Sequence, residues 1–303
     1  MKMVEWGLVG WQGLKVRVPP NWVLGKVEGT RLNGYLRLDD PEMPRLELRW
    51  GPSGGSKRSI ETLAERYLKQ ARKIALRSKT PFEYQYRKPF FSSGGRELVY
   101  LTLQSDYPSH IIVSRCKSCG RVVLARVLHR PDESVGQIVG VVFGTLRDHA
   151  PSGKNLWSVF DLHARVPDAF ELSASSFPVG AIRLEFLRGK DRLVLERYNF
   201  ARDQLGGESL KRWLVQVLRK ELKPFRLASD KAAYRGHEVV CLTGQPRTWQ
   251  RIVSIGLRRR GCSVVAWACP QSDRLYAVRL FSRSAGLDEL VSIANTVVCH
   301  QRA

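Results

Sequence analysis

The sequence lacks any apolar run long enough to cross a membrane, and it contains few cysteines. The longest apolar stretch, residues 138–146, is interrupted by Gly140, Gly144 and Thr145, which argues against a membrane-spanning helix. No apolar segment of signal-peptide length occurs near the N-terminus, where Glu5 interrupts the pattern, so we expect a cytoplasmic protein. Six cysteines in 303 residues do not indicate a disulfide framework.

Acidic residues are also scarce. The chain has 28 Asp and Glu against 50 Lys and Arg, a net charge of +22, and residues 1–152 and 153–303 each carry half of it. Most of the cations are arginine, which pairs bidentately with phosphate and carboxylate. This predicts an anionic partner: nucleic acid, an acidic protein or large complex, or an acidic membrane surface. The alternative is that genome composition or thermal adaptation enriched arginine, although thermal adaptation does not predict few acids.

The two halves of the chain repeat one pattern. Leu14-x-x-Arg17-Val18-Pro19 recurs as Leu162-x-x-Arg165-Val166-Pro167. Further along, Cys116, Arg121, Arg126, Thr145 and His149 correspond to Cys269, Arg274, Arg279, Thr296 and His300. One long period predicts two copies of a domain, residues 1–152 and 153–303, which form a pseudo-dimer within one chain.

Hydrophobic periodicity predicts the elements of one copy. Alternation indicates strands at 14–18, 35–38, 46–50, 82–86, 97–103, 110–115 and 121–128. Helical spacing from Ser59 predicts a helix whose inner face holds Ile60, Leu63, Ala64, Tyr67, Leu68, Ala71 and Ile74, and a second helix over 134–146. The second copy repeats the order, with a helix over 210–218 that Pro224 closes. We therefore predict an α+β fold: two tandem copies of a mainly antiparallel sheet of six to seven strands with two packing helices.

This order of elements, with the early Val18-Pro19 and the aromatic residues Trp22 and Phe170 that follow each Val-Pro, resembles the PsbP-like α/β/α sandwich. That family includes the extrinsic photosystem protein and a Ran-GTPase release factor. The resemblance covers both halves and implies a binding or assembly domain that docks on larger complexes. It assigns no functional residue.

Cys116-Lys117-Ser118-Cys119-Gly120 is similar to one knuckle of a zinc ribbon, so Cys116 and Cys119 are candidate metal ligands. A structural zinc needs four ligands, and the second copy has Ser272 at the position of Cys119. The alternatives are an ordinary β-hairpin turn, zinc held together with His129 or another chain, and redox use. His149 and His300 follow the terminal helices, and we interpret them as helix caps.

The candidate nucleic-acid site is the connection between Gln245 and Ser263, which is longer than its counterpart in the first copy. It carries Arg247, Trp249, Arg251, Arg258, Arg259 and Arg260. Arginines supply phosphate contacts, and an exposed tryptophan stacks on an unpaired base. Basic helix faces add Arg66, Lys69, Arg72, Lys73, Lys211, Arg212, Arg219 and Lys220. Solvated helix faces and a hairpin extension packed on its domain are the alternatives.

The histidines, serines and cysteines show no recognisable catalytic arrangement, and we predict a protein that is not an enzyme. The first hypothesis is a basic two-domain protein that binds nucleic acid, with RNA somewhat preferred because Trp249 suits an unpaired base. The alternative is a protein-interaction adaptor or assembly subunit that docks on an acidic partner or large complex.

Overall fold

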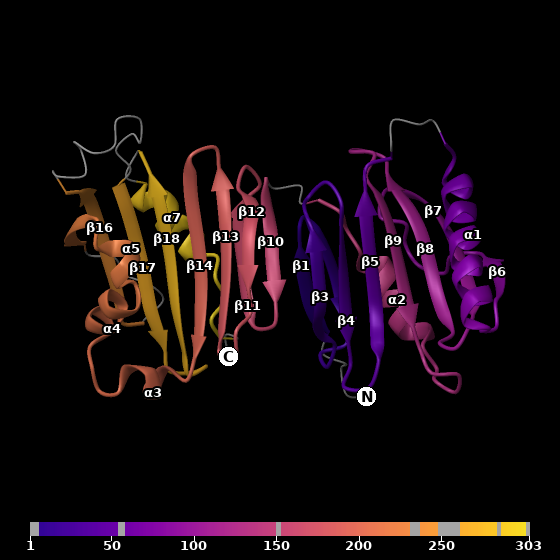
Figure 1. Cartoon of the computed structure of the whole chain (residues 1–303), viewed down its shortest axis with the longest axis horizontal. Helices are drawn as coiled ribbons and strands as arrows, with labels where there is room; N and C mark the ends of the chain where they lie inside the picture. The colour runs from indigo at the N-terminus through magenta and orange to yellow at the C-terminus, as the bar shows by residue number, and fades with distance from the viewer. Residues whose placement is uncertain are drawn as a thin grey trace. The chain divides into compact units, whose positions relative to one another are not determined.

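The computed structural model describes residues 6–53, 58–149, 153–230, 237–247, 261–283 and 286–300. The chain divides into two compact units, Met1–Phe160 and Asp161–Ala303, whereas the predicted boundary lay between residues 152 and 153. The described strands form one sheet of four strands and two sheets of seven (Figure 1).

The first unit is built on a seven-stranded antiparallel sheet of order β3-β4-β5-β9-β8-β7-β6. Its elements are β1 (Gly7–Trp11), β2 (Leu14–Val18), β3 (Val23–Gly29), β4 (Gly34–Asp39), β5 (Pro44–Gly51), α1 (Ile60–Ser78), β6 (Glu83–Arg87), β7 (Arg96–Gln104), β8 (Ser109–Cys116), β9 (Val122–Leu128), α2 (Gly136–Thr145) and β10 (Lys154–Val159). Helix α1 packs mainly on β7 and β8, at one end of the sheet (Figure 1).

The two faces of this sheet differ in burial. On one face, alternate residues of β5 and β9 such as Leu46, Leu48 and Val127 are almost fully buried, as are the α2 residues Val139 and Phe143. The alternation that buries these residues places the intervening residues of β5 on the opposite face, the one that α1 partly covers. On that opposite face α1 buries a smaller core with β7 and β8, and the part of the face beyond α1 stays open.

Local sequence explains why α1 begins where it does. Ser59 has extended backbone angles and its Oγ accepts a hydrogen bond from the backbone N–H of Thr62, at 3.2 Å. This satisfies one of the donors that a helix N-terminus leaves without an intrahelical partner. The helix ends at Lys79, which adopts left-handed angles with φ of 55°.

The second unit contains the other seven-stranded antiparallel sheet, of order β12-β13-β14-β18-β17-β16-β15. Its elements are β11 (Leu162–Pro167), β12 (Glu171–Ser176), β13 (Ala181–Arg188), β14 (Asp191–Asn199), α3 (Ala201–Leu205), α4 (Leu210–Val217), α5 (Arg219–Leu222), β15 (Phe225–Asp230), β16 (Val239–Pro246), β17 (Gly261–Cys269), β18 (Arg274–Ser282) and α7 (Leu287–Ala294). Leu210, Trp213 and Leu214 of α4 join a buried cluster with Val264 and Leu242 of the sheet.

The predicted fold class, two copies of a sheet with two packing helices, is wrong in these respects. The four-stranded sheet has the order β11-β10-β1-β2, so the early hairpin strands do not belong to the seven-stranded sheets. The described part of the chain has six helices, because α3, α4 and α5 replace a single helix in the second unit.

The reason for the error lies in what periodicity detects. Gln12 and Gly13 adopt positive φ values in a tight turn, which folds Gly7–Trp11 back on Leu14–Val18. Strands β3 and β12 have almost no buried residue, so they lack the alternation by which a half-buried strand is recognised. Among the described helices, none is long and apolar enough to span a membrane.

Candidate functional site

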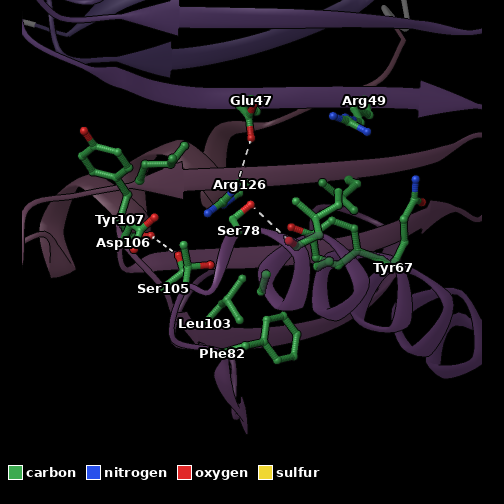
Figure 2. Close-up of a pocket in the computed structure, with 17 residues that line it drawn as sticks. Glu47, Arg49, Tyr67, Ser78, Phe82, Leu103, Ser105, Asp106, Tyr107 and Arg126 are labelled. Carbon is green, nitrogen blue, oxygen red and sulfur yellow. Dashed lines mark hydrogen bonds and ion pairs between the residues drawn. The ribbon is translucent and has the colours of Figure 1, made fainter.

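A groove of about 300 Å³ opens between α1 and the sheet of the first unit (Figure 2). Helix α1 supplies one wall, and strands β5, β7 and β9 supply the opposite wall and the floor. The lining residues are Glu47, Arg49, Tyr67, Gln70, Ala71, Ile74, Ala75, Ser78, Thr80, Phe82, Leu103, Ser105, Asp106, Tyr107, Leu124, Arg126 and Leu128. The groove lies where α1, which packs mainly on β7 and β8, faces β5.

The floor of the groove is apolar. Leu103 and Leu128 are buried, and Phe82 and Leu124 are half-buried. Ile74 of α1 is 58% exposed, although its spacing predicted a place on the inner face of the helix. The apolar stripe of α1 therefore continues past the core contact and forms part of the groove.

The sheet side of the groove carries charge. Figure 2 shows Glu47, Arg49 and Arg126 on the strands, across from Tyr67 on the helix. Glu47 accepts a hydrogen bond from the Tyr35 hydroxyl at 2.7 Å and lies 3.6 Å from a guanidinium nitrogen of Arg126. Burial, together with the hydrogen bond to Glu47, raises the pKa of Tyr35 well above its usual range, and burial also raises the pKa of Tyr67. Both phenols stay neutral at physiological pH.

Positive charge occurs both in the groove and on helix α1. The guanidinium of Arg49 lies 5.4 Å from the centre of the Tyr35 ring, and the side chain is exposed. Among the described residues no carboxylate pairs with Arg49. Helix α1 adds five basic residues against two acidic ones: Arg66, Lys69, Arg72, Lys73 and Arg77 against Glu61 and Glu65.

In the second unit, buried ion pairs fill the place that corresponds to the groove. Arg279, which corresponds to Arg126 in the repeat, is fully buried, and its Nη1 lies 2.7 Å from Glu196. Glu221 of α5 also reaches Arg279, at 3.5 Å, and pairs with Arg192 at 2.6 Å. The interruption of the helix between α4 and α5 brings this carboxylate to the sheet. The first unit, with its continuous α1, has no such cover.

The predicted nucleic-acid residues do not converge on one described site. Arg247 is exposed, and its Nε donates to the carbonyl of Phe225 at 3.3 Å. Trp249, Arg251, Arg258, Arg259 and Arg260 lie outside the described residues. Arg66, Lys69, Lys73, Arg212 and Arg219 are exposed on α1, α4 and α5, and none lines the groove. Arg212 lies 3.5 Å from Glu208.

The structure places the two predicted metal ligands beside two residues that the C-x-x-C pattern did not include. Cys116 and Cys119 lie with Asp148 and His149, and the four donor atoms are within 4.8 Å of one another. His149 therefore lies with the thiols rather than acting as a helix cap. His129 is not in the cluster; its ring lies 5.4 Å from that of His110, and its Nδ1 lies 2.7 Å from the carbonyl of Arg130.

No family model and no curated protein matches the sequence. Among solved structures, the chain is similar to immunity protein TplEi of T6SS from Pseudomonas aeruginosa complexed with "L" peptide, at 13% identity over 98% of each chain and a TM-score of 0.33. The apo structure of the same immunity protein matches at 10% identity over 96% of each chain, with a TM-score of 0.34. At these TM-scores the likeness carries no argument about the fold or function of this chain.

Proposed function

We propose that this chain is a non-enzymatic protein-docking module whose first unit binds an acidic segment of a partner protein. The groove between α1 and the sheet receives one apolar side chain of that segment. The observation that supports this most directly is the combination of an apolar floor with the exposed Arg49, which lines the groove, on a unit whose helix α1 is basic.

The size and lining of the groove suit a side-chain anchor. Binding energy at protein interfaces concentrates in a few apolar or aromatic side chains that fill desolvated pockets, surrounded by a polar rim. A cavity of about 300 Å³ is at the small end of ligand sites and suits such an anchor. Leu103, Leu124 and Phe82 would contact it.

The charges favour an acidic partner, and the apolar floor favours a protein segment over nucleic acid. Arg49 in the groove and the basic residues of α1 attract carboxylates. Glu47 lies 3.6 Å from Arg126, which compensates its charge, and a phosphate backbone has no apolar side chain to fill the floor. RNA binding was the first hypothesis from the sequence, and the experiment below distinguishes it from binding of a protein segment.

The test is a selection of binders from a random peptide library on the full chain, followed by direct binding of the enriched peptide by fluorescence polarisation. We expect enriched peptides that combine acidic residues with one apolar anchor. Ile74→Glu places a negative charge at the groove and should weaken binding by roughly tenfold or more, the effect of losing a well-packed anchor contact.

Leu76→Glu is the matched control. It makes the same change on the same helix at a side chain that is 70% exposed and does not line the groove, so we expect unchanged affinity. Equal effects of the two variants, or enrichment of basic peptides, would overturn the proposal. Tight, salt-sensitive binding of single-stranded RNA in place of peptide would support the nucleic-acid alternative.

A further inference from the structure

The second unit contains a compact group of two cysteines and two histidines. His237, Cys269, Cys299 and His300 place one donor atom each within 4.8 Å of the others. Cys269 and Cys299 are buried, and the two histidines are half-buried. Cys269 ends β17, Cys299 and His300 follow α7, and His237 precedes β16, so the fold collects donors from three separate segments.

The distances fit a tetrahedral metal site. Cys299 Sγ lies 3.2 Å from His237 Nε2 and 3.3 Å from His300 Nδ1, and Cys269 Sγ lies 3.2 Å from His300 Nδ1. Zinc bonds of about 2.3 Å to sulfur and about 2.0 Å to nitrogen, arranged tetrahedrally, separate neighbouring ligand atoms by roughly 3.3–3.8 Å. These three separations are close to the tetrahedral values, and the remaining pairs lie within 4.8 Å.

The first unit has a comparable group at the equivalent place. Cys116 corresponds to Cys269, and His149 to His300, in the repeat. The other two donors differ in kind: Cys299 stands at the position of Asp148, and Cys119 has Ser272 as its counterpart. The second unit regains a fourth donor from His237, which comes from a different segment. A set of four donors persists although its members changed, which is the pattern expected when the ability to bind a metal is maintained.

We propose that His237, Cys269, Cys299 and His300 bind a structural zinc ion in the second unit. Two thiolates and two imidazoles form one of the usual closed ligand sets of structural zinc. The bound ion links the segment after α7 to the end of β17 and the segment before β16. This inference is independent of the proposed peptide groove, which belongs to the other unit.

Cys116, Cys119, Asp148 and His149 form a second, weaker site of the same kind in the first unit. Cys119 Sγ lies 3.2 Å from Asp148 Oδ2, and His149 Nδ1 lies 3.7 Å from Cys116 Sγ. Cys119 is exposed, and the His149 side chain is 41% exposed, so water and chelators reach this ion more easily.

The experiment is elemental analysis of the purified full chain, together with the absorption spectrum after exchange with Co²⁺. We expect one zinc ion per unit, thiolate-to-cobalt charge-transfer bands, and the intense visible bands of tetrahedral cobalt. A chelator should remove the ion of the first unit before that of the second. Cys269→Ser with Cys299→Ser should remove one ion and leave the other, and Cys116→Ser with Cys119→Ser should do the reverse.

Cys262→Ala is the matched control, because this buried cysteine lies in the apolar cluster of the second unit, away from the proposed ligands. It should keep the metal content and the cobalt spectrum. If a ligand variant does not fold, protection of the wild-type thiols from a thiol reagent by added zinc gives the same answer. No metal above the blank, no thiol protection, or a Cys269–Cys299 disulfide in the purified chain would overturn the proposal.

Discussion

The pair Arg126 and Arg279 offers a sharp test of the difference between the two units, because the repeat places them at equivalent positions. Arg279 is fully buried, and its partner Glu196 is 5% exposed. Arg126 lies in the open groove, where both it and Glu47 are 21% exposed. Replacing each arginine by methionine keeps a long flexible side chain and removes the charge.

Arg279→Met leaves the Glu196 carboxylate with less compensation in a buried place. Removal of one partner from a buried ion pair costs about 3–5 kcal/mol of unfolding free energy. Glu196 retains a contact with Arg183 and a hydrogen bond from Tyr198, so we expect the lower part of that range. A loss of about 3 kcal/mol corresponds to a fall in melting temperature of roughly 10 °C for a unit of this size.

Arg126→Met should cost no more than about 1 kcal/mol, because water reaches both partners of that pair. Calorimetry and urea unfolding of the full chain measure both variants. The double variant Arg279→Met with Glu196→Gln should recover part of the loss, since no buried charge is then left without its partner. Equal losses of unfolding free energy at the two positions would refute the claim that α5 fills, in the second unit, the place that corresponds to the groove of the first unit.

Two further predictions concern the core of the first unit. Burial, with smaller contributions from His129 and Arg87, lowers the pKa of His110 to about 4, and its Nδ1 lies 2.6 Å from the Tyr100 hydroxyl. The unfolded chain therefore binds the proton more readily than the folded chain. Between pH 6.5 and pH 4 the wild type should lose up to about 3 kcal/mol of unfolding free energy that His110→Phe does not lose. Urea unfolding across pH measures this, and parallel pH profiles of the two proteins would contradict it. Phe143→Ala removes a fully buried ring packed against Phe91 and Tyr100 and should cost about 3–5 kcal/mol by the same assay, and a loss below about 1 kcal/mol would mean that α2 is not part of the core.

Periodicity identified much of the secondary structure of the first unit. The strands predicted at 97–103 and 110–115 lie within β7 and β8, and the helix predicted from Ser59 is α1. Strand β7 and helix α1 each expose some of their residues, and the spacing of their apolar residues reflects this. The hairpin of β1 and β2 forms part of a separate sheet through a turn that depends on the positive φ of Gln12, which no hydrophobic pattern encodes. The resemblance to the PsbP-like sandwich stays a prediction.

The candidate sites were harder to predict because their residues are far apart in sequence. The groove is lined by residues from Glu47 to Leu128. Helical spacing placed Ala71 and Ile74 on the buried face of α1, but both residues line the groove. Cys116 and Cys119 drew attention because a short motif contains both. The cluster of the second unit has no such motif, since its donors extend from His237 to His300. The repeat, which pairs Cys116 with Cys269 and His149 with His300, was the signal that could have located it.

Hydrogen exchange of the full chain with and without the selected acidic peptide tests the docking proposal most directly. The account predicts new protection of backbone amides in the C-terminal half of α1 and in β5 and β9, which line the groove. The same protection should be absent in Ile74→Glu and present in Leu76→Glu. Protection confined to the second unit, or to the arginine-rich segment around residues 258–260, would contradict the proposal that the groove of the first unit binds the partner.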